Sequence, residues 1–196
     1  MSALLQTPSQ TVGPYFAYGL TSSQYGYDFK SLFPPQLAQP HAKGQRIQII
    51  GQVLDGAGNS MADAMVEISQ ADADGHWAKT PAEVATSGFS GFGRCGTGTL
   101  AQNQYLFDSV KPGATAAGQA PYISVCVTAR GMLVHSFTRI YFDDEAAANA
   151  EDSVLASVPV ERRTTLIAKR EDSAAGVVYR FDIRMQGPQE TVFFDL

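Results

Sequence analysis

The sequence predicts an all-β protein with an antiparallel β-sandwich core, an extended N-terminal arm and one or two short helices. Residues 64–70 alternate apolar and polar residues with a period of two, several other segments are rich in β-prone residues, and turn-forming residues separate most of these segments. Helical periodicity is confined to two short stretches. At 196 residues and 44% hydrophobic composition, the chain is long enough to bury a substantial core without disulfide bonds.

The arm is predicted over residues 1–45. This segment is rich in Pro, Gly, Gln, Ser and Tyr and shows no regular period. Its prolines remove backbone donors and therefore resist regular structure. Aromatic residues are frequent between Tyr15 and Phe33. We therefore expect the arm to be ordered and packed against a surface.

The core is predicted over residues 46–196, and residues 1–196 as a whole are predicted to form one domain. No repeat, linker or low-complexity tract interrupts the chain. Strands are expected, in order, at residues 46–54, 64–70, 104–110, 122–129, 132–142, 177–184 and 190–194. Turn dipeptides such as Asp55-Gly56 and Arg130-Gly131 separate them. Helices are expected at residues 143–150 and 161–168.

Charge and hydropathy exclude several classes of protein. The formal net charge is −5 and no basic stripe is present, so nucleic acid is not an expected partner. No apolar run approaches the ~18 residues of a membrane span, and no signal peptide is expected. Cys95 and Cys126 are interpreted as reduced thiols, which predicts a cytoplasmic protein. Only 17% of residues are charged, against a usual value of about 25%, which suggests a surface covered by partners.

The residues alone assemble no complete catalytic site. His41, His76 and His135 are far apart in sequence, unlike the clustered histidines of metal sites. Neither cysteine has a neighbouring His or Lys that would lower its thiol pKa. Arg130 lies at the tip between two predicted strands. Its guanidinium could bind a substrate carboxylate with two parallel hydrogen bonds, or it could be a solvated turn residue; its position favours the second interpretation.

Nine blocks of sequence, taken in order, carry a resemblance that spans nearly the whole chain. They are Thr7–Tyr15, Gly51–Val53, Asp55-Gly56, Glu67–Asp72, Gly91–Arg94, Val110–Gly113, Thr138–Glu145, Tyr179–Arg184 and Glu190–Asp195. Each block is weakly specific alone, but their number and order are not coincidental. Together they resemble the intradiol ring-cleavage dioxygenases, and in particular the α chains of the family's two-chain enzymes.

The resemblance implies a β-sandwich fold and an oxidative function. Two-chain members of the family pair related α and β chains in a higher hetero-oligomer, with the active site between the chains. Fe(III) is bound there by two Tyr and two His of the partner β chain, and the substrates are a small aromatic acid and O2. The two histidines form a His-x-His pair on a strand, so that both project from one face.

This sequence departs from that ligand pattern at every position. Tyr122 and Ser124 stand where the two histidines would be. Ala114 follows Lys111-Pro112-Gly113, where the iron-binding chain has Tyr. The span between Tyr27 and Tyr105 lacks the other tyrosine. The resemblance therefore implies that the β chain and not this chain binds the iron, so this chain alone is inactive and contributes no catalytic residue.

The matching positions imply a substrate-binding role for this chain. Arg130 would bind the substrate carboxylate, and Thr11, Gly13, Pro14 and Tyr15 would wall the partner's pocket. Two alternatives remain. One is a homomeric dioxygenase that binds iron through a different arrangement. The other is a catalytically silent β-sandwich binding or carrier module without an obligate dioxygenase partner.

Overall fold

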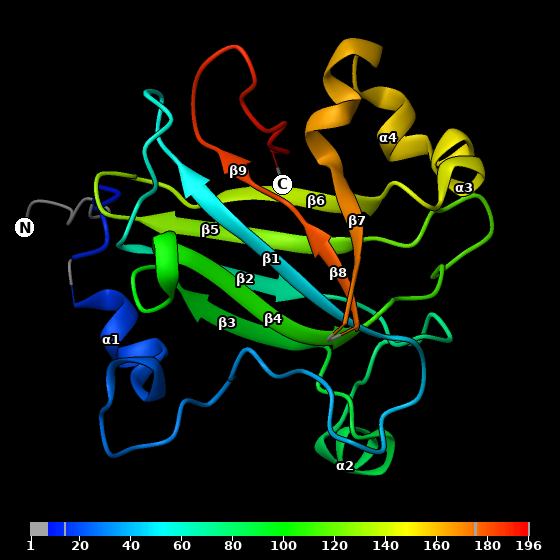
Figure 1. Ribbon diagram of the computed structural model, residues 1–196, viewed down its shortest axis with the longest axis horizontal. Coiled ribbons are helices and arrows are strands. Elements are labelled where there is room, and N and C mark those ends of the chain that lie inside the picture. The colour runs from blue at the N-terminus through cyan, green and yellow to red at the C-terminus, as the bar shows by residue number, and fades with distance from the viewer. Residues whose placement is uncertain (1–7, 14, 175, 196) are drawn as a thin grey trace, which may run out of the picture.

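The computed structural model describes residues 8–13, 15–174 and 176–195, which form nine strands in two layers (Figure 1). One layer joins β3 (Phe92–Gly96), β2 (Ala64–Ser69), β5 (Ile123–Ala129) and β6 (Ser136–Phe142). The other joins β7 (Ile167–Ser173), β8 (Gly176–Arg180), β1 (Arg46–Leu54) and β4 (Gln104–Val110), with the short β9 (Ile183–Arg184) beside β1. A short parallel pairing of β6 with β7 connects the layers.

The main core lies between the two layers. Burial alternates along β1, β4 and β5, as expected for strands that turn one face toward a core. Ile49 and Phe107 from one layer and Val127 from the other are fully buried in the same cluster. The all-β class and the sandwich are therefore confirmed.

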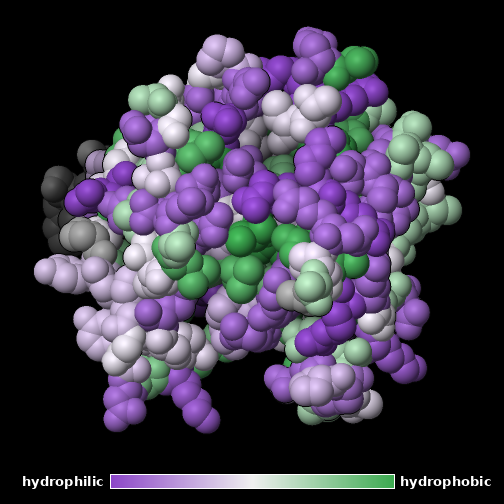
Figure 2. Space-filling model, viewed as in Figure 1, coloured by the Kyte–Doolittle hydropathy of each residue, from purple (hydrophilic) through white to green (hydrophobic). Residues whose placement is uncertain are grey.

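The layer that contains β7, β8, β1 and β4 has an outer face that is less polar than a solvent-facing sheet usually is. Ile50, Leu106 and Val178 are half-buried there, and Ile50 pairs directly with Leu106. Apolar side chains gather at the centre of this face (Figure 2). Although single exposed apolar residues are normal, a contiguous group marks a surface suited to contacts with another molecule.

Most strand pairs of the sandwich are antiparallel, as predicted, but the sheet also contains parallel pairs that the sequence did not indicate. β1 runs parallel to β8 and β9, and β6 runs parallel to β7. The chain between β6 and β7 forms α3 (Ala146–Glu151), α4 (Ser153–Ser157) and the 3₁₀ helix η3 (Val160–Leu166). Because this long connection returns the chain to its starting end, the next strand enters parallel to β6.

Several predicted elements also differ from the structure. Residues 190–194 form no strand and contribute one isolated bridge, Phe137 with Phe194. Residues 161–168 are mainly the 3₁₀ helix η3 rather than an α-helix, and the expected strand 177–184 is divided into β8 and β9. The described residues contain four short α-helices instead of one or two, since α1 (Phe16–Leu20) and α2 (Pro81–Ser87) are added to α3 and α4.

The described part of the arm packs on the chain's own sandwich, a choice that the sequence left open between this domain and another chain. Gln24 accepts a hydrogen bond from the Gly96 N–H at 2.8 Å and donates to the Gly96 carbonyl at 3.3 Å. Leu37 is buried, and its N–H donates to the Asp108 carbonyl at 2.8 Å. The arm therefore borders both layers, contacting β3 in one and β4 in the other. A bilayer-spanning helix is not found in the described part of the chain.

Three of the sequence blocks meet at a charged cluster. Lys111 Nζ lies 2.8 Å from Asp144 Oδ2 and 2.7 Å from Glu145 Oε1, and Tyr179 donates its hydroxyl to Asp144 at 2.9 Å. Partial burial opposes both charges, but these hydrogen bonds outweigh it and raise the pKa of Lys111 while lowering that of Asp144. The lysine of the Lys-Pro-Gly turn therefore has a structural role.

A second, smaller core is organised around the buried carboxylate of Asp152. Its Oδ1 accepts hydrogen bonds from the Leu155 N–H at 2.8 Å and the Tyr141 hydroxyl at 3.1 Å, and its Oδ2 accepts one from the Ala120 N–H at 3.0 Å. Burial, with the charge of Asp152 nearby, raises the pKa of Tyr141 to about 12, so the hydroxyl stays protonated and can donate. The carboxylate thus caps α4 and fastens it to β6.

We predict that Asp152→Ala lowers the free energy of unfolding by about 3 kcal/mol, because it leaves buried donors without an acceptor. Urea unfolding followed by circular dichroism measures the change. Glu151→Ala removes the neighbouring exposed carboxylate and is the matched control. A loss at Asp152 as small as that of the control would contradict this role.

Candidate functional site

The turn between β5 and β6 presents Arg130 to solvent. β5 ends at Ala129, and Gly131 follows Arg130 with a φ of +91°, a conformation that favours glycine. The Met132 N–H donates to the Ala129 carbonyl at 3.2 Å and closes the turn. The Arg130 side chain is 65% exposed. A cation held on a rigid turn is well placed to bind an anion from outside the chain.

The N-terminal arm reaches this same turn. Thr11 accepts a hydrogen bond from the Gly131 N–H through its hydroxyl oxygen at 2.7 Å. Val12 and Phe16 line a small cavity of about 320 Å³ together with Leu133, which belongs to the segment between β5 and β6. The structure therefore brings together Thr11 and Arg130, which are far apart in the sequence.

Gly13 and Tyr15 continue the arm toward α1. The Gly13 carbonyl accepts a hydrogen bond from the Phe16 N–H at 3.1 Å, which turns the chain into the helix. A side chain at Gly13 would meet no neighbouring atom, so its surface is open to another molecule. Tyr15 is 78% exposed, and its ring centroid lies 5.8 Å from that of Tyr18. Pro14, the remaining predicted residue, lies outside the described residues.

Asp63 completes this group and was missed from the sequence. Its Oδ2 lies 2.9 Å from Arg130 Nε. The pairing of β2 with β5 places Ala64 opposite Ala129, so Asp63 and Arg130 are the next two residues beyond the paired strands. In the sequence, Asp63 appears only as a carboxylate directly before a predicted strand. Its closeness to Arg130 cannot be inferred until the pairing of β2 with β5 is known.

The positions that match the β-chain histidines hold other side chains in other interactions. The Tyr122 ring lies under the Arg139 guanidinium at 4.1 Å, and it also contacts the ring of Tyr141 at 6.3 Å. Ser124 lies on β5 on the same face, two residues further along, with only a hydroxyl to offer. Neither side chain supplies the imidazole nitrogen that the family pattern requires at these positions.

The loop after β4 also differs from an iron-binding loop. The Gly113 N–H donates to the Asp72 carbonyl at 2.8 Å, and the Ala114 carbonyl packs so closely against Gly75 that a side chain there would collide with it. Ala114 supplies only a methyl group. Within the described ranges, no group of three or more His, Cys, Asp or Glu is arranged to hold a metal ion. The residues at the matching positions do not fit Fe(III).

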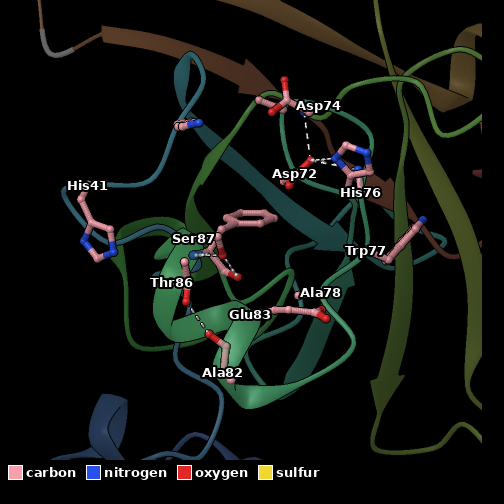
Figure 3. A pocket seen from close by; sticks show the side chains of 13 residues that line it. His41, Asp72, Asp74, His76, Trp77, Ala78, Ala82, Glu83, Thr86 and Ser87 are labelled. Carbon is pink, nitrogen blue, oxygen red and sulfur yellow. Dashed lines mark hydrogen bonds and ion pairs between the residues drawn. The ribbon is translucent and has the colours of Figure 1, made fainter.

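A cavity of about 620 Å³ opens beside this loop, next to α2 (Figure 3). His41 and His76 lie on opposite sides of it, although they are distant in sequence, and Trp77 forms part of its wall. His76 Nδ1 is 3.8 Å from Asp72 Oδ1, and the third histidine, His135, packs instead on the ring of Phe137 at 4.6 Å. The three histidines thus share no common site.

The two thiols are not activated nucleophiles. Burial raises the pKa of Cys95 above its ordinary value, and burial with the nearby Glu67 raises the pKa of Cys126 to about 11. Nucleophilic cysteines have a lowered pKa instead. Both thiols are therefore protonated at neutral pH and act as packing residues.

Thr11, Gly13 and Tyr15 of the arm, together with Arg130 of the turn, are called the arm–turn group. This group and the position of Tyr122, which matches a ligand histidine, lie at opposite ends of the sandwich. Tyr122 precedes the first residue of β5, and Arg130 follows its last. At about 3.4 Å per residue, the strand separates them by roughly 25 Å. The arm and the turn lie on the left of Figure 1, whereas the start of β5 lies on the right. The two groups therefore cannot form one site within this chain.

Comparison with known proteins identifies the family. The family model described as Dioxygenase matches residues 31–187. The chain is 61% identical to the protocatechuate 3,4-dioxygenase alpha chain of Burkholderia cepacia over the full length of both, and 31% identical to the beta chain from that organism over 76% of this chain and 67% of the other.

A solved structure shares the fold. The dioxygenase domain of a dioxygenase–carbohydrate-binding protein fusion from Streptomyces sp. SirexAA-E superposes with a TM-score of 0.61 at 22% identity, covering 91% of this chain and 97% of that one. The resemblance found in the sequence blocks is thereby confirmed. The chain belongs to the intradiol ring-cleavage dioxygenases, an iron-dependent family.

Proposed function

We propose that this chain is the α subunit of a protocatechuate 3,4-dioxygenase and works in a complex with an iron-binding β chain. The chain is 61% identical, over the full length of both, to an alpha chain of that name, and this similarity supports the assignment. In this proposal the β chain holds Fe(III), while this chain supplies part of the substrate pocket. Several αβ pairs then assemble into the larger enzyme.

One observation carries the proposal. The residues suited to binding an anionic aromatic substrate lie about one strand length away from the chain's own remnant of an iron site. Arg130, Thr11, Gly13 and Tyr15 face outward and have no reacting centre beside them. Such a group becomes useful when a second chain places its own reacting centre against it.

The reaction is the opening of an aromatic ring by O2. The substrate is 3,4-dihydroxybenzoate, and both oxygen atoms of O2 are inserted as the bond between the two hydroxyl-bearing carbons breaks. The ring is oxidised and O2 is reduced, which gives 3-carboxy-cis,cis-muconate. The metal of the β chain supplies the oxidative chemistry, so the contribution of this chain is to bind and orient the substrate.

Each arm–turn residue has a distinct part in that binding. The two terminal nitrogens of Arg130 can hold the substrate carboxylate in a bidentate pair. Tyr15 offers an aromatic face with a hydroxyl at its edge. Thr11 fixes the arm to the turn through its hydrogen bond with Gly131. Gly13 lets the arm backbone approach a ligand closely, because no side chain stands in the way.

We predict that the chain purified alone does not cleave 3,4-dihydroxybenzoate, and that co-expression with its cognate β chain gives a stable complex that does. The assays are size-exclusion chromatography, O2 uptake and loss of substrate absorbance. A chain that stays monomeric beside the β chain would favour the carrier-module alternative and contradict the proposal.

Arg130→Ala in the αβ complex is expected to raise the KM for 3,4-dihydroxybenzoate by about 10- to 100-fold, since a charge-assisted bidentate contact contributes roughly 1.5–3 kcal/mol. The iron content of the complex should not change, because Arg130 lies outside any metal site. Steady-state kinetics and metal analysis measure the two quantities.

The matched control is Arg180→Ala. Arg180 on β8 pairs through its Nε with Glu171 Oε1 at 3.1 Å and is 40% exposed, so it resembles Arg130 in geometry but not in location. Its replacement should leave the KM as it was. If Arg130→Ala released the iron instead of raising the KM, the loss would indicate an assembly defect and not a pocket contact.

A further inference from the structure

Asp63 is fixed beside Arg130 by the register of two strands. Ala64 of β2 pairs with Ala129 of β5, so the preceding residue of one strand and the following residue of the other lie across from each other. Cross-strand neighbours of opposite charge attract. The register thus brings the two turn residues close enough for Asp63 Oδ2 to lie 2.9 Å from Arg130 Nε.

The contact uses only one side of the guanidinium. Asp63 meets Nε, and within the described ranges neither terminal nitrogen of Arg130 donates a hydrogen bond. These two nitrogens form the edge that suits a carboxylate with two oxygens. Arg130 can therefore keep its contact with Asp63 and bind a second carboxylate at the same time.

The contact also restrains Arg130. Asp63 Oδ2 is covered from solvent although the side chain is 34% exposed, and no well-aligned hydrogen bond reaches this oxygen. Arg130 Nε is the cation that compensates its charge. If the guanidinium swung away, this oxygen would lose that partner. Because the pair is largely exposed, the restraint is modest: it favours one orientation of Arg130 without adding much to the stability of the fold.

We propose that Asp63 is a positioning residue that holds Arg130 with its terminal nitrogens facing the substrate, and so makes the enzyme select catechols that carry a carboxylate. This inference rests on the proposed function. An exposed ion pair contributes little to folding stability. The effect of Asp63 should therefore appear in substrate selection and not in the melting temperature.

The test uses the αβ complex and two substrates, 3,4-dihydroxybenzoate and catechol, which lacks the carboxylate. Asp63→Asn keeps the shape of the side chain and removes its charge. We expect the ratio of kcat/KM between the two substrates to fall about three- to tenfold, through a higher KM for 3,4-dihydroxybenzoate. Asp63→Ser removes the carboxylate without introducing an amide, so it checks that the asparagine amide is not the cause. It should show the same fall in this ratio.

Two further variants separate positioning from a general structural effect. In an Arg130→Ala background, Asp63→Asn should change the ratio no further, because the group it positions is gone. Glu171→Gln removes the carboxylate from the matched pair on the other layer, where Glu171 Oε1 lies 3.1 Å from Arg180 Nε. That variant should leave the ratio as it is in the unmodified complex.

The outcomes separate a failure of the positioning role of Asp63 from a failure of the proposed function. If Arg130→Ala lowers the ratio and Asp63→Asn does not, the positioning role is overturned and the proposed function stands. The positioning role is also overturned if Asp63→Asn lowers the ratio equally with and without Arg130. If neither Arg130→Ala nor Asp63→Asn lowers it, Arg130 does not read the carboxylate, and both the role of Asp63 and the substrate-binding part of the proposed function fail.

Discussion

Strand β5 pairs with β2 in a register that sets Ala129 opposite Ala64, and the positions of the candidate site residues follow from this pairing. The register places Asp63 next to Arg130 at one end of the strand. It also fixes the turn whose Gly131 N–H binds Thr11 of the arm. A slip of one residue would turn every β5 side chain to the opposite face and bury the polar ones. Because alternate β5 residues fill the main core, such a slip is strongly disfavoured.

This arrangement separates structural from functional roles along one strand. At the start of β5, Tyr122 packs under Arg139 and takes part in stabilising the second core. At its end, Arg130 is exposed and held by its ion pair with Asp63. The chain has thus kept the sandwich of an iron enzyme while the matching ligand positions serve packing. The arm–turn group at the other end is what it can offer to a partner.

The strands that are rich in β-prone residues and bounded by turn residues could be predicted from the sequence, and those without these signals could not. β1 and β4 were predicted with the bounds that they have, because both are rich in β-branched, aromatic or other apolar residues and turn residues follow each of them. β3 contains Gly93 and Gly96, which have no side chain to show a period. β7 is exposed along most of its length and charged, so it lacks an apolar face, and it starts by pairing in parallel with the distant β6.

Only part of the candidate site could be predicted from the sequence. Arg130 and the arm residues came from the resemblance, since the residues alone favoured a solvated arginine. The turn contact with Thr11 and the ion pair with Asp63 join segments distant in the chain, and only the tertiary pairing reveals them. The structure supplied both contacts, together with the separation between the arm–turn group and the remnant metal positions.

The most direct test of this account is the iron content and visible absorption of the chain purified alone, compared with its complex with the β chain. The account predicts a colourless, iron-free chain and a coloured complex with one iron for each αβ pair. Stoichiometric iron in the lone chain, with the visible absorption of tyrosinate bound to Fe(III), would contradict it. The chain would then be an iron enzyme in its own right.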